Sequence, residues 1–306
     1  MSSYSMSFTV LRSAIAVGAM LAASTSWAST TNCTGDAFSS RCALYVDASG
    51  GAGGNTASLG PEVRGGSAFA VNLSRSFLEL ASLARFELSG VAAFGSLRNR
   101  VAVSTGTTGV NLAPHVNASA NLNTYFSDRL TFIDASQAPG TLGTAYASVA
   151  ITGAVSASPT DRFTTSSSHA QVTINGASVS VTALGDRANI GGIPGVITFA
   201  LPVKFNAEDF TSLNVQLLTS AVASALNIPD AVYAASASAN FGNTVEWLGI
   251  DRIVDANGAV VDGWSVQSAT GFDYAQSYAA QAVPEPGSAG LLLLGLAVVL
   301  RARLRH

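Results

Sequence analysis

Charged side chains are scarce in this chain of 306 residues. They make up 11% of it, and lysine occurs once, at Lys204. Surface helices are usually built from Glu, Lys and Arg, so this composition argues against a helical protein. The formal net charge is −3. An acidic chain suits neither nucleic acid nor anionic lipid, and we expect neither as a partner.

Cysteine and histidine are rare as well, with two and three residues. No Cys-x-x-Cys or His-x-x-x-His spacing occurs, so we predict no metal site of the zinc type. No phosphate loop or dinucleotide fingerprint is present either, and we predict no cofactor. Cys33 and Cys42 are close together, and in an oxidising compartment such a pair forms a disulfide. Metal binding by this pair is the alternative, although neither His115 nor His169 is near in sequence.

Catalytic motifs are missing too. A Ser168, His169 and Asp161 triad can be drawn, but no Gly-x-Ser-x-Gly context surrounds a serine. We therefore interpret His115 and His169 as surface loop residues and predict that the chain is not an enzyme.

Some acidic residues could still do chemistry in pairs. Glycoside hydrolysis needs two carboxylates across a cleft, and Glu246 with Asp251, or Glu79 with Glu87, are candidates whose separation the sequence does not give. The Asp251 to Asp262 region could hold calcium, but we favour a β-turn that uses Asp255 and Asn257.

Two tryptophans offer a second kind of site. The aromatic faces of Trp247 and Trp264 suit sugar rings, and we name both as candidate glycan-facing residues. Packing of both rings in the core or at an edge is the competing interpretation.

Short segments of alternating apolar and polar residues fill the body. One runs from Ile197 to Phe205, and Asn-Gly corners at 175–176 and 257–258 predict hairpins. We predict an all-β fold, an antiparallel sandwich of jelly-roll-like form. Residues 209–226 fit a strand or a helix, and the glycine-rich residues 49–54 are expected to form a flexible loop.

Residues 1–28 have the pattern of a secretory signal peptide. Arg12 supplies positive charge, an apolar run follows, and small residues precede the bond between Ala28 and Ser29. We expect export through the Sec translocon and cleavage at that bond by signal peptidase.

The C-terminal residues 283–306 contain three parts in a fixed order. A Pro-Glu-Pro unit favours an extended spacer, because proline fixes φ and lacks an N–H. Residues 287–300 are uncharged and would span roughly 21 Å as a helix, less than the ~30 Å hydrocarbon core. Arginines at the end favour the cytoplasmic side. The residues that define the first and last parts are Val283, Pro284, Glu285, Pro286, Arg301, Arg303 and Arg305.

This tail resembles the PEP-CTERM sorting signal of Gram-negative bacteria. The resemblance implies recognition and cleavage by exosortase, a membrane cysteine transpeptidase, and an association with exopolysaccharide. The body is also similar to ectodomains that carry this tail, through residues 126–132 and 240–244 with Gly249 and Ile250. That similarity supports a shared fold more than a shared activity.

We therefore expect four segments. They are a signal peptide (1–28), a disulfide-bearing segment with the glycine-rich loop (29–60), an all-β ectodomain (61–282) and the sorting signal (283–306). With both ends removed, the net charge falls from −3 to −6. The expected function is a structural or adhesive role at the cell surface or in the matrix. A carbohydrate-binding or carbohydrate-active module and an unprocessed tail-anchored envelope protein are the alternatives.

Overall fold

The chain folds almost entirely into β-strands. The computed structural model describes residues 43–52, 55–64, 68–79, 82–108, 115–158, 162–185, 191–192, 195–228 and 230–281. Within these ranges, the one helix is the four-residue α1 (Tyr278–Gln281), and all pairings between named strands are antiparallel. The prediction of an all-β fold is confirmed.

The strands form two sheets. Sheet A has the order β10 (Ala177–Leu184), β9 (Thr164–Ile174), β13 (Thr211–Leu226), β6 (His115–Ile133), β1 (Ala43–Ala52) and β2 (Asn55–Arg64), and β15 (Ser265–Ser268) also pairs with β6. Sheet B has the order β11 (Gly191–Gly192), β8 (Ala154–Ala157), β14 (Ala234–Asp255), β5 (Ser96–Gly106), β4 (Ser82–Ala93) and β3 (Phe69–Glu79). In sheet B, β7 (Leu142–Ile151) pairs with β14, and β12 (Val196–Lys204) pairs with β7.

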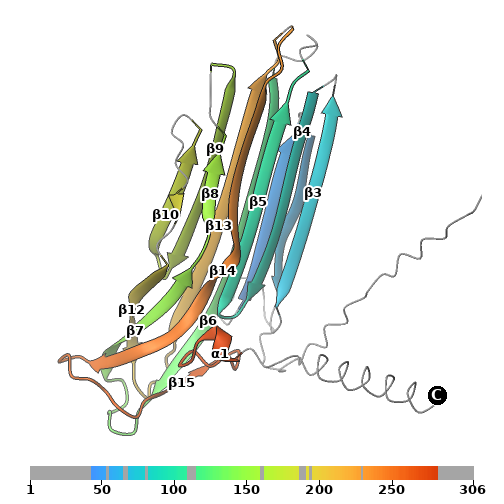
Figure 1. The fold of residues 1–306 in the computed structure, drawn as a ribbon. Coiled ribbons are helices and arrows are strands. Elements are labelled where there is room, and N and C mark those ends of the chain that lie inside the picture. Colours follow the sequence, from blue (N-terminus) through green and yellow to red (C-terminus); the bar gives the residue numbers. More distant parts are fainter. Residues whose placement is uncertain are drawn as a thin grey trace, which may run out of the picture.

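The two sheets pack face to face. β4 and β5 of sheet B lie against β6 of sheet A, and β14 lies against β13. Figure 1 shows the long strands of both layers running side by side, with β14 curving toward β7 and β12 at its lower end. Register shifts in β14, after Phe241, Trp247 and Ile250, allow this curve and let one strand pair with β5, β8 and β7.

Alternation of side chains builds the core between the sheets. In β9 and β13 nearly every second residue is buried, as period two requires when one face is covered. Residues 211–226 are strand throughout, so their helix-like spacing is incidental. The predicted hairpin at Asn175-Gly176 joins β9 to β10, and both turn residues have the positive φ of a tight hairpin turn. Asn257 and Gly258 likewise close a short hairpin, in which Val254 bridges Val260.

The N-terminal part of the sheet corrects one expectation. Residues 49–52 continue β1 and pair with both β2 and β6, so the predicted glycine-rich loop is wrong for these residues. Pairing on both sides stabilises even a glycine-rich strand, because it satisfies the backbone hydrogen bonds. β2 also runs through the predicted segment boundary at residue 60.

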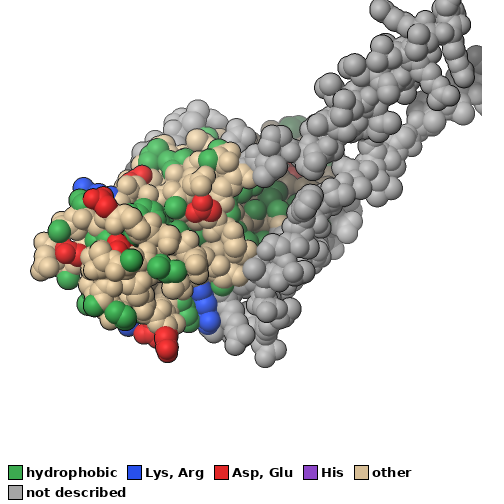
Figure 2. All heavy atoms as spheres, turned by 90° about the horizontal axis from the view of Figure 1, so that it is seen from below, with side chains coloured by type: hydrophobic (Ala, Val, Ile, Leu, Met, Phe, Trp, Pro, Cys, Tyr) green, Lys and Arg blue, Asp and Glu red, His purple; other side chains and the backbone are tan. Residues whose placement is uncertain are grey.

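The core changes in character along the strands. Toward the start of β6 and of β14 the inward side chains are small, and we call this the alanine end: Ala118, Ala120, Ala221, Ala223, Ala235, Ala237 and Ala239. At the opposite end the core holds large rings, and we call this the aromatic end: Phe126, Phe132, Phe205, Trp247 and Tyr274. The aromatic end is the lower end in Figure 1, near α1 and β15. Seen from below, its surface shows scattered apolar side chains and few charged ones (Figure 2).

Between the two ends, Asn99 joins the sheets by hydrogen bonds. It lies on β5 with no exposed surface, and its Nδ2 donates to the carbonyl oxygens of Leu122 (3.1 Å) and Leu217 (2.9 Å) in sheet A. Thr124 Oγ1 donates to Asn99 Oδ1 at 2.9 Å. A buried amide whose hydrogen bonds are made in this way fixes how the sheets sit on one another.

A C-terminal strap, residues 265–281, closes the aromatic end. Trp247 Nε1 donates to the Tyr274 carbonyl oxygen at 2.9 Å, and the two rings meet edge to face. The ring of Phe272 lies over Gly95, where a Cβ would come within 2.4 Å of it. Gln281 ends the strap by hydrogen bonding to the backbone of Asp273 through both amide atoms. The strap therefore belongs to the folded body.

Candidate functional site

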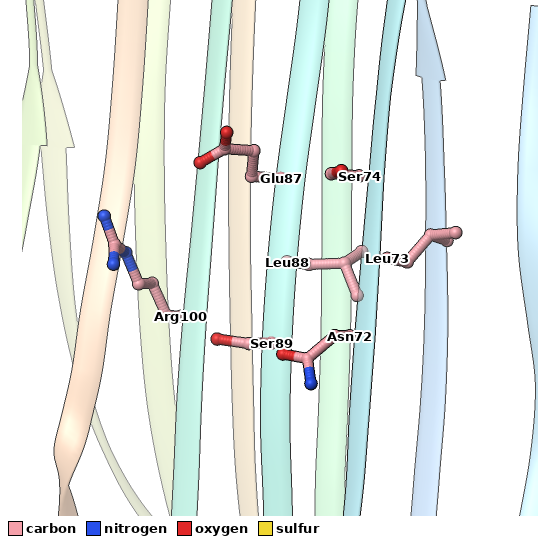
Figure 3. Close-up of a pocket in the computed structure, with 7 residues that line it drawn as sticks. All are labelled: Asn72, Leu73, Ser74, Glu87, Leu88, Ser89 and Arg100. Atoms are coloured by element: carbon pink, nitrogen blue, oxygen red, sulfur yellow. The ribbon is translucent and has the colours of Figure 1, made fainter. Parts of the chain in front are cut away.

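The outer face of sheet B carries an open depression over β3, β4 and β5. Its volume is about 300 Å³, and it is lined by Asn72, Leu73, Ser74, Glu87, Leu88, Ser89 and Arg100. Alternation along β4 explains the lining, because Phe86, Leu88 and Gly90 are buried in the core while Glu87 and Ser89 point outward. Figure 3 shows the polar side chains of Glu87, Ser89 and Arg100 reaching over the same side of the sheet.

Strand register arranges these side chains in rows across the sheet. Ser89 is opposite Asn72 on one side and Arg100 on the other, and Arg100 is opposite Asn240 of β14. Because neighbouring strands are about 4.8 Å apart, the row spans roughly 14 Å. A second, parallel row contains mostly small side chains: Ser74, Glu87, Ala102, Ser238 and Ser156. The two rows make a shallow polar track across the strands.

Positive charge gathers beside this track. Arg85 and Glu87 form an ion pair on β4, which neutralises the one carboxylate in the depression. Arg98 and Arg100 are exposed on the outer face of β5, two residues and roughly 6.6 Å apart along the strand. Among the described residues, no ion pair involves either of these two arginines. A locally basic surface thus lies on a protein whose net charge is negative.

The outer face of sheet A differs because amides and hydroxyls cover it. Gln216 Nε2 donates to Asn123 Oδ1 at 2.9 Å, and Tyr125 Oη and Ser127 Oγ both donate to Asn214 Oδ1 at 2.7 and 2.8 Å. These bonds link β6 to β13 on the solvent side. Since the side chains satisfy one another, this face is less open to a ligand than the track on sheet B.

The groups with shifted pKa values lie inside the sandwich and not in the depression. Burial raises the pKa of Asp128, although hydrogen bonds from Thr270 Oγ1 and from the Arg129 N–H favour its charged form. Burial and the negative charge of Asp128 raise the pKa of Tyr274 well above 10.0. The Tyr274 hydroxyl faces this carboxylate but lies outside regular hydrogen-bond geometry. With no exposed surface on Asp128 or Tyr274, the cluster anchors the strap to β6 and offers no access to a substrate.

Trp247 and Trp264 have different surroundings. Trp247 is 1% exposed and packs edge to face against Phe199 and Tyr274, so the prediction that it faces a glycan is wrong. The competing interpretation of core packing holds for this residue. Trp264 is half-buried and remains a candidate.

The histidines lie in strands and not in loops. His115 begins β6, opposite Leu226, and His169 lies in β9, where its Nδ1 is 2.9 Å from Thr182 Oγ1. Neighbouring residues of a strand point to opposite faces, so Ser168 points inward, where its Oγ donates to the Ser156 carbonyl oxygen. Ser168 and His169 therefore do not face each other, and Asp161 lies outside the described residues.

The candidate carboxylate pairs are not brought together by the register. Glu87 is opposite Ser74, five residues before Glu79, which corresponds to roughly 17 Å along the strands. Glycosidase carboxyl groups are about 5–9.5 Å apart. Glu246 and Asp251 are five positions apart on β14, and Asp251 accepts a 2.6 Å hydrogen bond from Ser148 Oγ.

Asp255 lies in a turn, as the favoured interpretation of the sequence predicts, and the calcium site was the alternative. Asp255 Oδ1 accepts hydrogen bonds from the N–H groups of Asn257 (2.8 Å) and Ala259 (2.9 Å). Its carboxylate thereby closes the turn on its own backbone. Across the part of the chain that is described, no group of three or more His, Cys, Asp or Glu residues is placed to hold a metal ion.

Several predicted sites lie outside the described residues. They are the signal cleavage site at Ala28 and Ser29, the cysteines Cys33 and Cys42, and the whole tail from Val283 to His306. Of the helices that the described ranges contain, none has the length and hydropathy needed to span a bilayer. Export, the disulfide and the sorting signal stay predictions.

Sequence reasoning missed the track on sheet B. Arg98 and Arg100 stand two apart in a strand-like segment, which signals a shared face, but their neighbours across β4 and β14 depend on the register. No family model, no curated protein and no solved structure matches this chain.

Proposed function

We propose that this chain is an exported protein of the bacterial surface or matrix, sorted by exosortase and structural or adhesive in role. The observation that carries the proposal is the order of parts in the tail: Val283-Pro-Glu-Pro286, an uncharged run, and Arg301, Arg303 and Arg305. An apolar run of about 21 Å is short for a stable span, so it suits a temporary hold on the inner membrane. The stiff Pro-Glu-Pro spacer then presents the cleavage site.

The architecture of the body supports this proposal. The body is an antiparallel sandwich, which we interpret as jelly-roll-like. With a signal peptide before it and a short transmembrane helix after it, this body would be a rigid exported unit. Its outer faces are rich in hydroxyl and amide groups and poor in charge, as suits contact with hydrated polysaccharide. The strap ends at Gln281, so the cleavage signal follows directly on the folded body. No catalytic step is part of this proposal.

Intact mass of the exported protein tests the sorting. The chain is produced with an internal tag at the exposed turn of residues 256–258, in a host with exosortase and in the same host without it. We expect loss of residues 1–28 in both hosts and loss of the apolar run with exosortase alone. The same mass reports the Cys33–Cys42 disulfide as a 2 Da difference, two hydrogens, on reduction.

The controls separate sorting from simple anchoring. Replacement of Pro284 and Pro286 by alanine should leave the apolar run in place with exosortase present. If the unchanged chain keeps its tail in both hosts, the tail is a plain anchor, and exosortase processing is wrong for this protein.

A carbohydrate-binding role is the second candidate. The polar track beside Arg100 favours it, because hydroxyl and amide side chains in rows match the donors and acceptors of sugar hydroxyls. Glycan-array binding by the exported body tests it, with Trp264→Ala as a variant of the remaining candidate tryptophan. Binding to no glycan on the array would leave the structural role without a carbohydrate ligand.

A further inference from the structure

We propose that the outer face of β3, β4, β5 and β14 binds a carboxylated polysaccharide, with Arg98 and Arg100 pairing with its carboxylates. The inference rests on the second candidate function and names its ligand class. The first step in the argument is charge. Both arginines are exposed on one face of β5, and Glu87 is already paired with Arg85. A guanidinium binds a carboxylate through two parallel N–H···O bonds, which suits uronate groups.

The neutral lining of the track points to a carbohydrate. Asn72, Ser74 and Ser89 line the depression beside Arg100, and Asn240 and Ser238 continue its two rows on β14. These side chains both donate and accept hydrogen bonds, as sugar hydroxyls do. A simple anion would use the arginines and leave this lining without a role.

The shape of the site favours a chain over a single sugar. The depression is open, and small side chains extend it across β14 to β8, where the Ser238 and Ser156 hydroxyl oxygens are 2.8 Å apart. A linear polymer can therefore cross several strands over a row in which Glu87 is the one long side chain. Its direction would be across the strands, along the rows.

Charge density argues against other polyanions. Two arginines stand among many neutral polar groups, and the protein as a whole is negative. Nucleic acid and polyphosphate carry their charges closer together than a polyuronate does, about one per 1.7 Å in duplex DNA, so an acidic protein repels them more strongly. The track also lacks the aromatic platforms on which bases stack: among the residues that line it, none is aromatic.

The test uses the full chain, purified after export, in affinity electrophoresis. The probes are polygalacturonate, neutral dextran and polyphosphate. We expect retardation by polygalacturonate that weakens with salt, since the contact is partly ionic. The double variant Arg98→Gln with Arg100→Gln should weaken binding about tenfold or more, because charge-assisted bonds are lost. Arg98→Lys with Arg100→Lys should retain part of the affinity, because the charge remains and the bidentate geometry is lost.

Arg252→Gln is the matched control. Arg252 is exposed on β14, in the same sheet, and its guanidinium lies over the Tyr146 ring away from the track. Its removal changes the net charge by one unit and should leave binding within about twofold. Equal loss in this variant, undiminished binding by the double variant, or stronger binding to dextran or polyphosphate would overturn the proposal.

The same samples separate this inference from the proposed sorting. Circular dichroism checks that the double variant is folded, and intact mass checks its cleavage. Correct cleavage without polygalacturonate binding refutes the ligand class alone. Binding by a chain that keeps its tail supports the ligand class and refutes the sorting alone.

Discussion

The two ends of the sandwich are packed by different side chains. At the alanine end, the inner faces of β6, β13 and β14 carry mostly alanine, and the larger side chains there come from β4 and β5, among them Phe86, Leu88 and Val103. At the aromatic end, large rings fill the core, and the strap of residues 265–281 covers it from the outside. The same strands serve both ends, so the difference lies in the side chains that these strands turn into the core.

This difference shows where the stability of the body is concentrated. Burial of a large apolar side chain contributes about 1.5–3 kcal/mol, whereas an alanine offers a single methyl group. The aromatic end therefore holds more energy per residue. It is also the end from which the chain continues into the predicted sorting tail, so a firm strap fixes the point where that tail leaves the body.

The largest effect is expected for Trp247→Ala at the aromatic end. The change removes a fully buried ring with its contacts to Phe199 and Tyr274, and leaves the Tyr274 carbonyl without its donor. We expect a loss of about 3–5 kcal/mol in the free energy of unfolding. Urea denaturation followed by circular dichroism measures it. Trp264→Ala, at a half-buried position, should cost clearly less, and equal losses would contradict the special role of the aromatic end.

A smaller loss is expected for Asn99→Leu, midway between the ends. Leucine has a similar shape but removes three hydrogen bonds that join β5 to β6 and β13. At roughly 1 kcal/mol for each bond, the loss should be about 2–3 kcal/mol. Stability that is unchanged or increased would mean that apolar packing can replace this connection between the sheets.

The alanine end is expected to respond to added volume. Ala221→Leu places three extra carbons in the core, where Ala221 is 1% exposed, and should cost about 1–3 kcal/mol by overpacking. Ser220→Leu is the neighbouring control, because Ser220 points to the outer face, and it should change stability by no more than about 0.5 kcal/mol. If the two variants behave alike, the core at this end has more space than its small residues suggest.

Local sequence pattern predicted the strands well, and it failed where pairing with distant strands determines the structure. Period-two alternation and the Asn175-Gly176 corner located strands and a hairpin, because both depend on neighbouring residues. Residues 49–52 read as a loop, since glycine is a weak strand former, but pairing with β2 and β6 overrides that preference.

The surroundings of the candidate site residues also depend on contacts that local sequence does not show. Burial of Trp247 depends on Phe199 and on the strap, whose Tyr274 is 27 residues away along the chain, and no local pattern encodes these contacts. Arg100 meets Ser89 and Asn240 only through register with β4 and β14. Alternation with Phe126 and Leu130 already places Asp128 on the inward face, but its contacts with Thr270 and Tyr274 of the strap depend on residues more than 140 positions away.

The smallest effect is expected at Asp128, and it shows in the pH dependence. Burial raises the pKa of this carboxyl above 3.8, so the folded protein binds a proton more tightly than the unfolded chain does. Its contribution to stability therefore falls as pH rises from 3.8 through the folded-state pKa, and is regained as pH is lowered.

Asp128→Asn removes this titration. It also leaves one acceptor oxygen for the two donors, Thr270 Oγ1 and the Arg129 N–H, at a cost of about 1 kcal/mol. Urea denaturation at several pH values should show the unchanged protein gaining stability over the variant as pH falls toward 3.8. If the difference in the free energy of unfolding between the two proteins stays constant, or if the variant gains stability as pH falls, burial does not raise the pKa of Asp128. Its carboxylate would then be better solvated than the closed aromatic end allows.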